Sequence, residues 1–255
     1  MSSFLDTMLA RAKADKQTIV LPEGDDPRTL EAAETILAQG VANLIILGNV
    51  AAIKESGRKL DGATLIDPQD SDLHDEFANT LYELRKHKGM TLEQAAEKVR
   101  DVLFFGVLMV KTGRADGMVS GARHSTGDVL RPSLQILKTA PGVKLVSSFF
   151  IMVVPNCEYG QNGTFLFSDC GLEIQPDAEK LAHIAVNSAQ SWKTLIGTEP
   201  VVAMLSHSTY GSAKNDDANK VVEAAAIARE LAPELTLDGE LQADAAMVPS
   251  VGASK

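Results

Sequence analysis

The stretch TIVLPEGDDPRTLEAAETILAQGVANLIILG, residues 18–48, decides the fold class of this chain. It begins with a short apolar run at 19–21 and ends with a second one within 42–48. Between them we expect a helix over 27–39, because proline suits the first turn of a helix and a glycine such as Gly40 suits its end. A strand, a helix and a strand in this order predict a parallel sheet with crossover helices.

The same alternation continues through the rest of the chain. Further strands are expected at TLIDP (64–68), DGMVSG (116–121), PVVAMLS (200–206) and LTLDGEL (235–241). Helical patterns cover residues 3–15, 73–86, 92–112, 126–139, 177–196 and 217–231. KLVSSFFIMVVP (144–155) and TFLFSDCG (164–171) look like a hairpin, because the polar turn CEYGQNG separates two apolar runs.

That hairpin interrupts the strand–helix rhythm just after Pro141. We therefore expect a domain boundary there, with a first α/β domain over 1–141 and a second, incomplete α/β domain over 142–255. A cleft between two domains is a usual place for a ligand.

Composition narrows the class of protein. The 255 residues carry 24 basic and 34 acidic side chains, a formal charge of −10, which argues against general binding to nucleic acid or anionic membranes. Two cysteines in a chain of this length do not make a disulfide framework, so a reducing, cytoplasmic location is expected. No apolar run reaches membrane-spanning length, and the amphipathic start lacks the continuous apolar stretch of a signal peptide.

The loop SGARHSTGDVLRP, residues 120–132, follows an expected strand and opens a helix. Free backbone amides at a helix start favour anions, and Arg131 can hold two phosphate oxygens through its planar fork. The other interpretation is a capped helix start, with Ser125 or Thr126 as the cap. The residue types weigh the two about equally. The candidate substrate-binding residues of this loop are Ser120, Ser125, Thr126 and Arg131.

A second loop, SHSTYGSAK at 206–214, also follows a buried strand and precedes a helix. Its spacing is not that of a Walker sequence, and alone it favours a polar turn slightly over a binding site. Two such loops at the carboxyl ends of parallel strands, however, lie where α/β proteins bind ligands. Its candidate substrate-binding residues are Ser206, Ser208, Thr209 and Lys214.

YELRKHKGM, residues 82–90, holds the one dense basic cluster of the chain, and its residue types favour a solvated helix end over a binding site. The carboxylates of Asp169, Asp238, Glu240 and Asp244 have no His or Cys at ligand spacing, so we expect turn and interface roles and no metal.

Taken together, these segments resemble the phosphate acetyl/butyryltransferase family. The match runs from IVLPEGDDPRTLEAA through YELRKHKGMT, DGMVSGARHSTGDVLRP, SSFFIMVVP, GTFLFSDCG and VAMLSHSTYGSAK to LDGELQADAA, in the family order. The resemblance implies two three-layer α/β/α domains flanking a cleft, as in the isocitrate and isopropylmalate dehydrogenases. It also implies a homodimer. The reaction it implies is direct attack of the coenzyme A thiol on acetyl phosphate in a ternary complex, with coenzyme A as substrate and no tightly bound cofactor.

Carried over from the family, Arg85 and Arg131 hold the phosphate and stabilise charge in the transition state. In the family a carboxylate acts as base toward the thiol, in a DLSRG-type section that follows VGASK. That section has no counterpart before Lys255. The resemblance therefore implies a first domain without its returning segment, no assigned catalytic base, and little acetyl transfer by these 255 residues alone.

Three other functions remain open at this point. A phosphate butyryltransferase differs only in the acyl pocket. A metal- and nicotinamide-dependent decarboxylating dehydrogenase has the same fold, but the chain lacks a credible metal cluster and a G-x-G-x-x-G stretch. The third alternative is a non-catalytic fragment that binds coenzyme A or phosphate.

Overall fold

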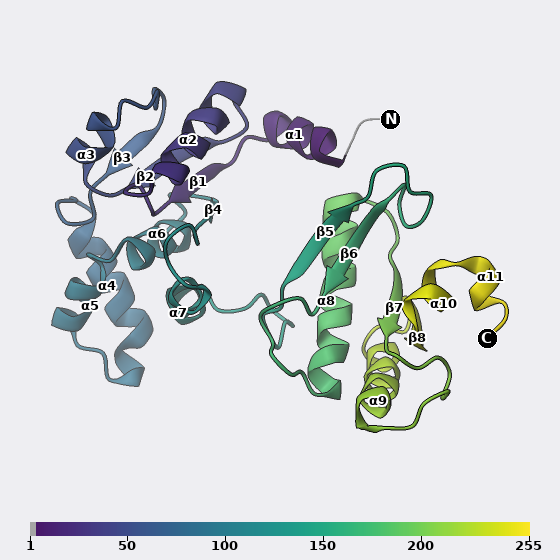
Figure 1. Ribbon diagram of the computed structural model, residues 1–255. Coiled ribbons are helices and arrows are strands. Elements are labelled where there is room, and N and C mark those ends of the chain that lie inside the picture. Colours follow the sequence, from purple (N-terminus) through teal and green to yellow (C-terminus); the bar gives the residue numbers. More distant parts are fainter. Residues whose placement is uncertain (1–3) are drawn as a thin grey trace. The chain divides into compact units, whose positions relative to one another are not determined.

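The computed structural model describes residues 4–255, which divide into two compact units. The first unit ends at Lys138 and the second begins at Thr139 (Figure 1). Each unit has hydrophobic core clusters of its own.

The first unit alternates strands and helices along the chain. Its elements are α1 (Phe4–Ala14), β1 (Thr18–Leu21), α2 (Pro27–Gln39), β2 (Asn43–Leu47), α3 (Val50–Glu55), β3 (Thr64–Ile66), α4 (His74–Arg85), the 3-10 turn η1 (Lys86–Lys88), α5 (Leu92–Lys98), α6 (Val102–Lys111), β4 (Gly117–Met118) and α7 (Thr126–Ile136). Its strands form one parallel sheet in the order β3-β2-β1-β4, as the strand–helix–strand pattern predicts.

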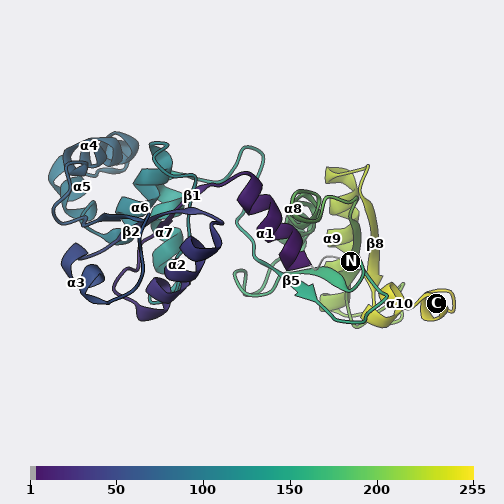
Figure 2. The same ribbon diagram turned by 90° about the horizontal axis from the view of Figure 1, so that it is seen from above.

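Alternate strand residues point to opposite faces of this sheet, and each face is covered by helices. Val20, Ile45 and Leu47 lie in one buried cluster with side chains of α4, α5, α6 and α7. Leu21 and Ile46 lie in the other, with side chains of α2 and α3. Figure 2 shows α4 and α5 on one side of the sheet and α2 and α3 on the other. The first unit is therefore the expected three-layer α/β/α arrangement.

The single helix expected over 92–112 is wrong, because two helices, α5 and α6, replace it. The carboxylate of Asp101 accepts hydrogen bonds from the amides of Leu103 (2.9 Å) and Phe104 (3.1 Å), which starts a new helix there. α6 is apolar all round and buried, and a Cβ at Gly106 would lie 2.7 Å from the sulfur of Met118. Because the chain breaks between them, α6 can take a direction of its own and pack closely on the sheet.

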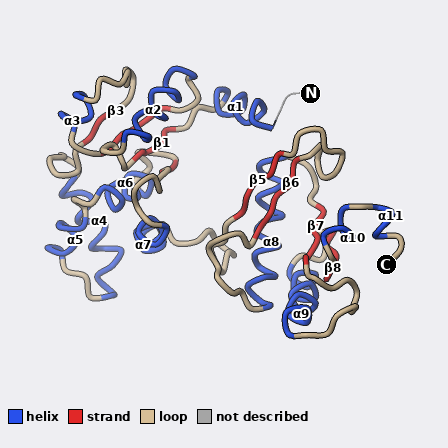
Figure 3. Tube along the Cα trace, in the orientation of Figure 1, coloured by secondary structure: helices blue, strands red, loops and turns tan. Residues whose placement is uncertain are grey.

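The second unit contains β5 (Phe149–Val153), β6 (Thr164–Ser168), α8 (Ala178–Ile196), β7 (Val201–Leu205), α9 (Asp216–Leu231), β8 (Thr236–Leu241), α10 (Ala243–Met247) and α11 (Pro249–Gly252). β5 and β6 pair antiparallel, which confirms the predicted hairpin (Figure 3). β7 and β8 pair parallel, with α9 as the crossover between them.

The described residues of the second unit form two layers, and the three-layer prediction is wrong for them. Val202 and Met204 of β7 pack against α8 and α9. On the opposite face Val201 and Leu205 are 82% and 52% exposed. Both long helices of this unit, α8 and α9, pack on the side of Val202 and Met204, and no described helix packs on Val201 and Leu205.

None of the helices in residues 4–255 is both long enough and apolar enough to cross a membrane.

Candidate active site

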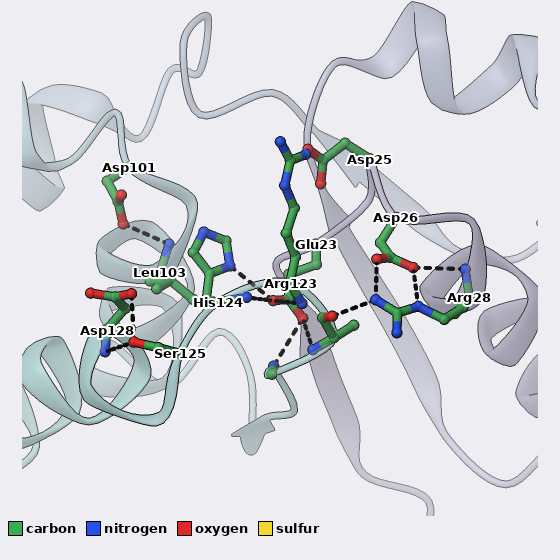
Figure 4. Close-up of polar contacts among 12 residues, drawn as sticks. Glu23, Asp25, Asp26, Arg28, Asp101, Leu103, Arg123, His124, Ser125 and Asp128 are labelled. Atoms are coloured by element: carbon green, nitrogen blue, oxygen red, sulfur yellow. Dashed lines mark hydrogen bonds and ion pairs between the residues drawn. The ribbon is translucent and has the colours of Figure 1, made fainter.

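Glu23 organises the loop that follows β4. It lies two residues beyond β1, the strand next to β4, and only 2% of its surface is exposed. Its Oε2 accepts hydrogen bonds from the amides of Gly121 and Ala122, and its Oε1 from those of Arg123 and His124, each at 2.9 Å. The ring nitrogen Nδ1 of His124 also contacts Oε1, at 2.8 Å (Figure 4).

These contacts keep Glu23 ionised. Burial raises the pKa of its carboxyl, but the hydrogen bonds from His124, Arg123 and Ala122 outweigh burial and lower the pKa from 4.5 to about 2. The adjacent Gly24 allows the close approach, since its amide donates to the carbonyl of Leu47 (3.0 Å) and a Cβ would lie 2.6 Å from that oxygen.

The sequence suggests free backbone amides for an external anion, but at positions 121–124 these amides donate hydrogen bonds to Glu23. The protein's own carboxylate occupies them, so this part of the loop expectation is wrong. The sequence missed Glu23 because its partners lie 98 to 101 residues further along the chain. The available signal was a glutamate placed just after a buried strand.

Two arginine contacts tie the same loop to the start of α2. Arg28 forms a bidentate pair with Asp26 (2.7 and 3.0 Å) and also donates to the carbonyl oxygen of Ala122. Asp26 caps α2, and the hydrogen bond from Arg28 lowers its pKa to about 2. Arg123 pairs with Asp25 in the same stretch (Figure 4).

The other predicted residues of this loop divide between structural and exposed positions. Ser125 caps α7, accepting from the amide of Asp128 and donating to its carboxylate (2.7 Å). Thr126 is exposed at the first position of α7. Arg131 is 61% exposed, with Asp128 3.5 Å away. The hydroxyl of Ser120 is buried and has no hydrogen-bond partner among the described residues. The capping alternative is thus confirmed for Ser125, while Arg131 and Ser120 keep bonding capacity.

Arg85 is the last residue of α4 and is partly buried. Its Nε is buried and has no hydrogen-bond partner within the part of the chain that the structure describes. The following residues of the basic cluster, Lys86, His87 and Lys88, are exposed in η1, and Lys86 pairs with Glu83 at 2.5 Å. The solvated-helix-end interpretation therefore fits these three neighbours but not Arg85.

The loop after β7 is also closed on a buried glutamate. Glu240 of β8 is 4% exposed, and its Oε1 accepts hydrogen bonds from the hydroxyl of Ser208 (2.9 Å) and the amide of Gly211 (2.6 Å). The Gly211 bond lowers the pKa of Glu240 more than burial raises it, and Ser208 adds to the lowering. Glu240 thus has the structural role expected from sequence, but its partner is this loop.

The predicted binding residues of this second loop differ in their burial and in their hydrogen bonds within the protein. Ser208 is fully buried and Thr209 is 4% exposed, and Thr209 accepts from the amide of Gln242 at 2.9 Å. Ser206 is half-buried and accepts from the amide of Ser208 (3.1 Å). Lys214 is exposed. Ser208 and Thr209 therefore shape the loop, and Ser206 and Lys214 remain more accessible.

Among residues 4–255 no group of three or more His, Cys, Asp or Glu side chains is placed to hold a metal ion. Cys157 and Cys170 are unpaired and partly buried.

Fold and site together define an α/β protein in which serine- and glycine-rich loops follow the carboxyl ends of parallel strands, the usual binding edge of such sheets. The model of the family described as "Phosphate acetyl/butaryl transferase" matches residues 3–255. The chain therefore belongs to this family.

Individual relatives agree with that assignment. A phosphate acetyltransferase from Acetivibrio thermocellus is 54% identical over 255 residues, covering 99% of this chain and 77% of the relative. A phosphotransacetylase structure from Streptococcus pyogenes matches with a TM-score of 0.90 and 42% identity, covering 99% of this chain and 77% of that one. The EutD phosphotransacetylase structure from Staphylococcus aureus matches with a TM-score of 0.88 and 41% identity, covering 99% and 76%.

Proposed function

We propose that this chain transfers an acetyl group between acetyl phosphate and coenzyme A. The observation that carries the proposal is the 54% identity, over nearly the whole chain, to a relative named phosphate acetyltransferase. Relatives of that name favour acetyl over butyryl as the acyl group.

In the proposed reaction the sulfur of coenzyme A attacks the carbonyl carbon of acetyl phosphate, and a base takes the thiol proton. A carbon–sulfur bond forms, and the bond between the carbonyl carbon and the bridging oxygen of the phosphate breaks. Inorganic phosphate leaves. The attack occurs in a ternary complex without a covalent acyl-enzyme. Negative charge grows on the departing phosphate, so the protein must place positive charge there.

Arg131 and Arg85 are the side chains proposed for this task. Arg131 is exposed and its ion pair with Asp128 is long, at 3.5 Å, so it can turn its planar fork toward a phosphate. Arg85 has a buried Nε that finds no hydrogen-bond partner in residues 4–255, and burying such a donor costs about 1–3 kcal/mol unless a ligand accepts from it. An anionic substrate would remove that cost.

The remaining substrate contacts are assigned by bonding capacity. We propose that Thr126, Ser206 and Lys214, which are exposed or half-buried, contact acetyl phosphate or coenzyme A. We propose the same for Ser120, whose buried hydroxyl has no hydrogen-bond partner among the described residues. Ser125, Ser208 and Thr209 act through the shape of the two loops, because their hydroxyls are engaged within the protein.

Several broader properties belong to the same proposal. They are a homodimer in the cytoplasm, domains over 1–141 and 142–255 that face across a cleft as in the isocitrate and isopropylmalate dehydrogenases, and no tightly bound cofactor. The net charge of −10 fits a protein that binds its anionic substrates only locally.

The test is an assay of acetyl-CoA formation from acetyl phosphate and coenzyme A, with butyryl phosphate as the competing substrate. The 255-residue chain is compared with the same chain extended by the corresponding last section of a relative. Faster turnover of butyryl phosphate would reject the acetyl assignment. Absence of acetyl transfer by both forms would reject the proposed function.

A further inference from the structure

We propose that Glu23 is the positioning residue of the loop 120–125: its carboxylate takes the place of a bound anion, so the substrate phosphate is held by side chains and not by the amides of that loop. The second half of this proposal rests on the proposed function. The first half does not, since it concerns only how the loop is held.

The carboxylate of Glu23 uses the amides of the loop fully, so none of them is left for a substrate. Its two oxygens accept four amide hydrogen bonds and one from the ring of His124, all between 2.8 and 2.9 Å. Hydrogen bonds to an ionised acceptor are about twice as strong as neutral ones. A phosphate that competed for these amides would also meet a buried negative charge, which opposes it. The amides of 121–124 are therefore excluded from substrate binding.

What the loop can offer to a substrate is then its side chains, and Glu23 determines where they lie. The ionised carboxylate needs a donor from His124, so Nδ1 carries the hydrogen of this contact and Nε2 is the ring nitrogen not used by Glu23. The next residue, Ser125, caps α7, the helix that carries Arg131. The segment 121–124, held by Glu23, thus leads directly into the start of α7, the helix that carries the proposed phosphate ligand Arg131.

The arrangement requires a carboxylate of this length. A glutamine at position 23 would turn one oxygen into a donor facing two amide donors, leaving those groups unsatisfied. An aspartate is shorter by one methylene and cannot meet both pairs of amides. Glu23→Ala removes the anion and leaves space of the kind that formate can fill.

The first experiment measures amide hydrogen exchange at residues 121–124 and needs no catalytic activity. In the wild-type chain these amides should be protected. In Glu23→Ala protection should fall at least 10-fold, and sodium formate should restore a large part of it. Glu23→Gln should lose protection and not respond to formate. Asp101→Ala is the matched control, because it also removes a carboxylate that holds backbone amides, at the start of α6.

The second experiment measures what the loop does for the substrate. In the chain extended by the last section of a relative, Glu23→Ala should lower the kcat/KM for acetyl phosphate about 100-fold, as expected for a misplacement near 1 Å. The KM for coenzyme A should stay within twofold, and formate should recover part of the loss. Binding of acetyl phosphate by calorimetry gives the same comparison without turnover. A purely structural loss would lower the amount of active protein and leave the KM for acetyl phosphate unchanged.

The outcomes separate the two proposals. Unchanged protection of 121–124 in both Glu23 variants would overturn the positioning role. Lost protection with unchanged use of acetyl phosphate would overturn its role toward the substrate. If protection responds as expected but no form of the chain transfers acetyl groups, the positioning of the loop stands and the proposed function fails. Should Glu23→Ala not fold, Glu23→Gln provides the exchange and binding comparisons with wild type, without the formate rescue.

Discussion

The hydroxyl of Ser208 donates a 2.9 Å hydrogen bond to the carboxylate of Glu240, although the two residues are 32 positions apart in the chain. Ser208 is fully buried and Glu240 is 4% exposed. The first unit has the same arrangement. Glu23 follows β1, and it holds the loop that follows β4, the parallel neighbour of β1. In each unit a buried glutamate at or just after the end of one strand closes the loop that follows the adjacent strand.

The Ser208–Glu240 contact should contribute measurably to stability. Ser208→Ala and Glu240→Gln should each lower the free energy of unfolding by about 1–3 kcal/mol, because each leaves buried polar groups without a partner. The double variant should lose less than the sum, with a coupling energy of about 1 kcal/mol. Urea unfolding of the four proteins checks this. Lys214→Ala, an exposed change in the same loop, is the control and should stay within ~0.5 kcal/mol of wild type. Strict additivity would contradict the direct interaction.

Arg131→Ala should lower kcat/KM for acetyl phosphate by at least ~100-fold, the loss typical of removing one charge-stabilising donor. Arg131→Lys should recover only part, because a point charge cannot replace the planar fork. Steady-state kinetics of the chain extended by the last section of a relative, with acetyl phosphate varied at saturating coenzyme A, measure the effect. Arg58→Ala, which removes an arginine paired with Glu34 (3.2 Å), should leave the kinetics unchanged. Full recovery by lysine would mean that the fork geometry is not used.

Arg85→Ala should weaken binding of inorganic phosphate while raising or leaving unchanged the stability of the folded chain. The reason is that its Nε is buried with no acceptor in the described part of the chain, so removing it relieves a cost in the free protein. Calorimetric titration with phosphate and urea unfolding give the two numbers. The neighbouring Lys86→Ala is the matched control, since Lys86 is exposed and pairs with Glu83. A variant that binds phosphate as wild type does would remove Arg85 from the site.

Much of the fold could be predicted because apolar runs and helical periodicity are local properties of the sequence. Residues 18–48 are predicted as a strand, a capped helix and a strand, and the structure has all three, with the two strands paired in parallel. The break at Asp101 could not be predicted in the same way, since 92–112 carries no proline and its one glycine, Gly106, lies inside α6. α5 ends at Lys98, and Asp101 caps the start of a separate helix, α6, which is buried against the sheet.

The candidate site was predictable at the level of loops but not of contacts. The residue types of 120–132 indicate an anion-holding loop, and the loop does hold an anion, but that anion is the side chain of Glu23. Only the pairing of β1 with β4 brings the two together. The same holds for Glu240 and the second loop, which meet through the pairing of β7 with β8.

The stability of the chain should carry an acid-dependent contribution from Glu23. Its pKa is about 2 in the folded chain against 4.5 for the free side chain, so ionisation stabilises the folded state at every pH above 4.5. The contribution is lost as the pH falls from 4.5 towards 2, and we expect it to be about 2 kcal/mol once solvent screening is allowed for. The measurement is the difference in unfolding free energy between wild type and Glu23→Gln, by urea titration at pH 7, 5, 4 and 3. That difference should be constant from pH 7 to 5 and shrink at pH 4 and 3. Glu55→Gln, which removes an exposed glutamate of the same unit, controls for the loss of one negative charge. A Glu23 difference that stays constant down to pH 3 would mean that the carboxylate is not held as an anion by the loop.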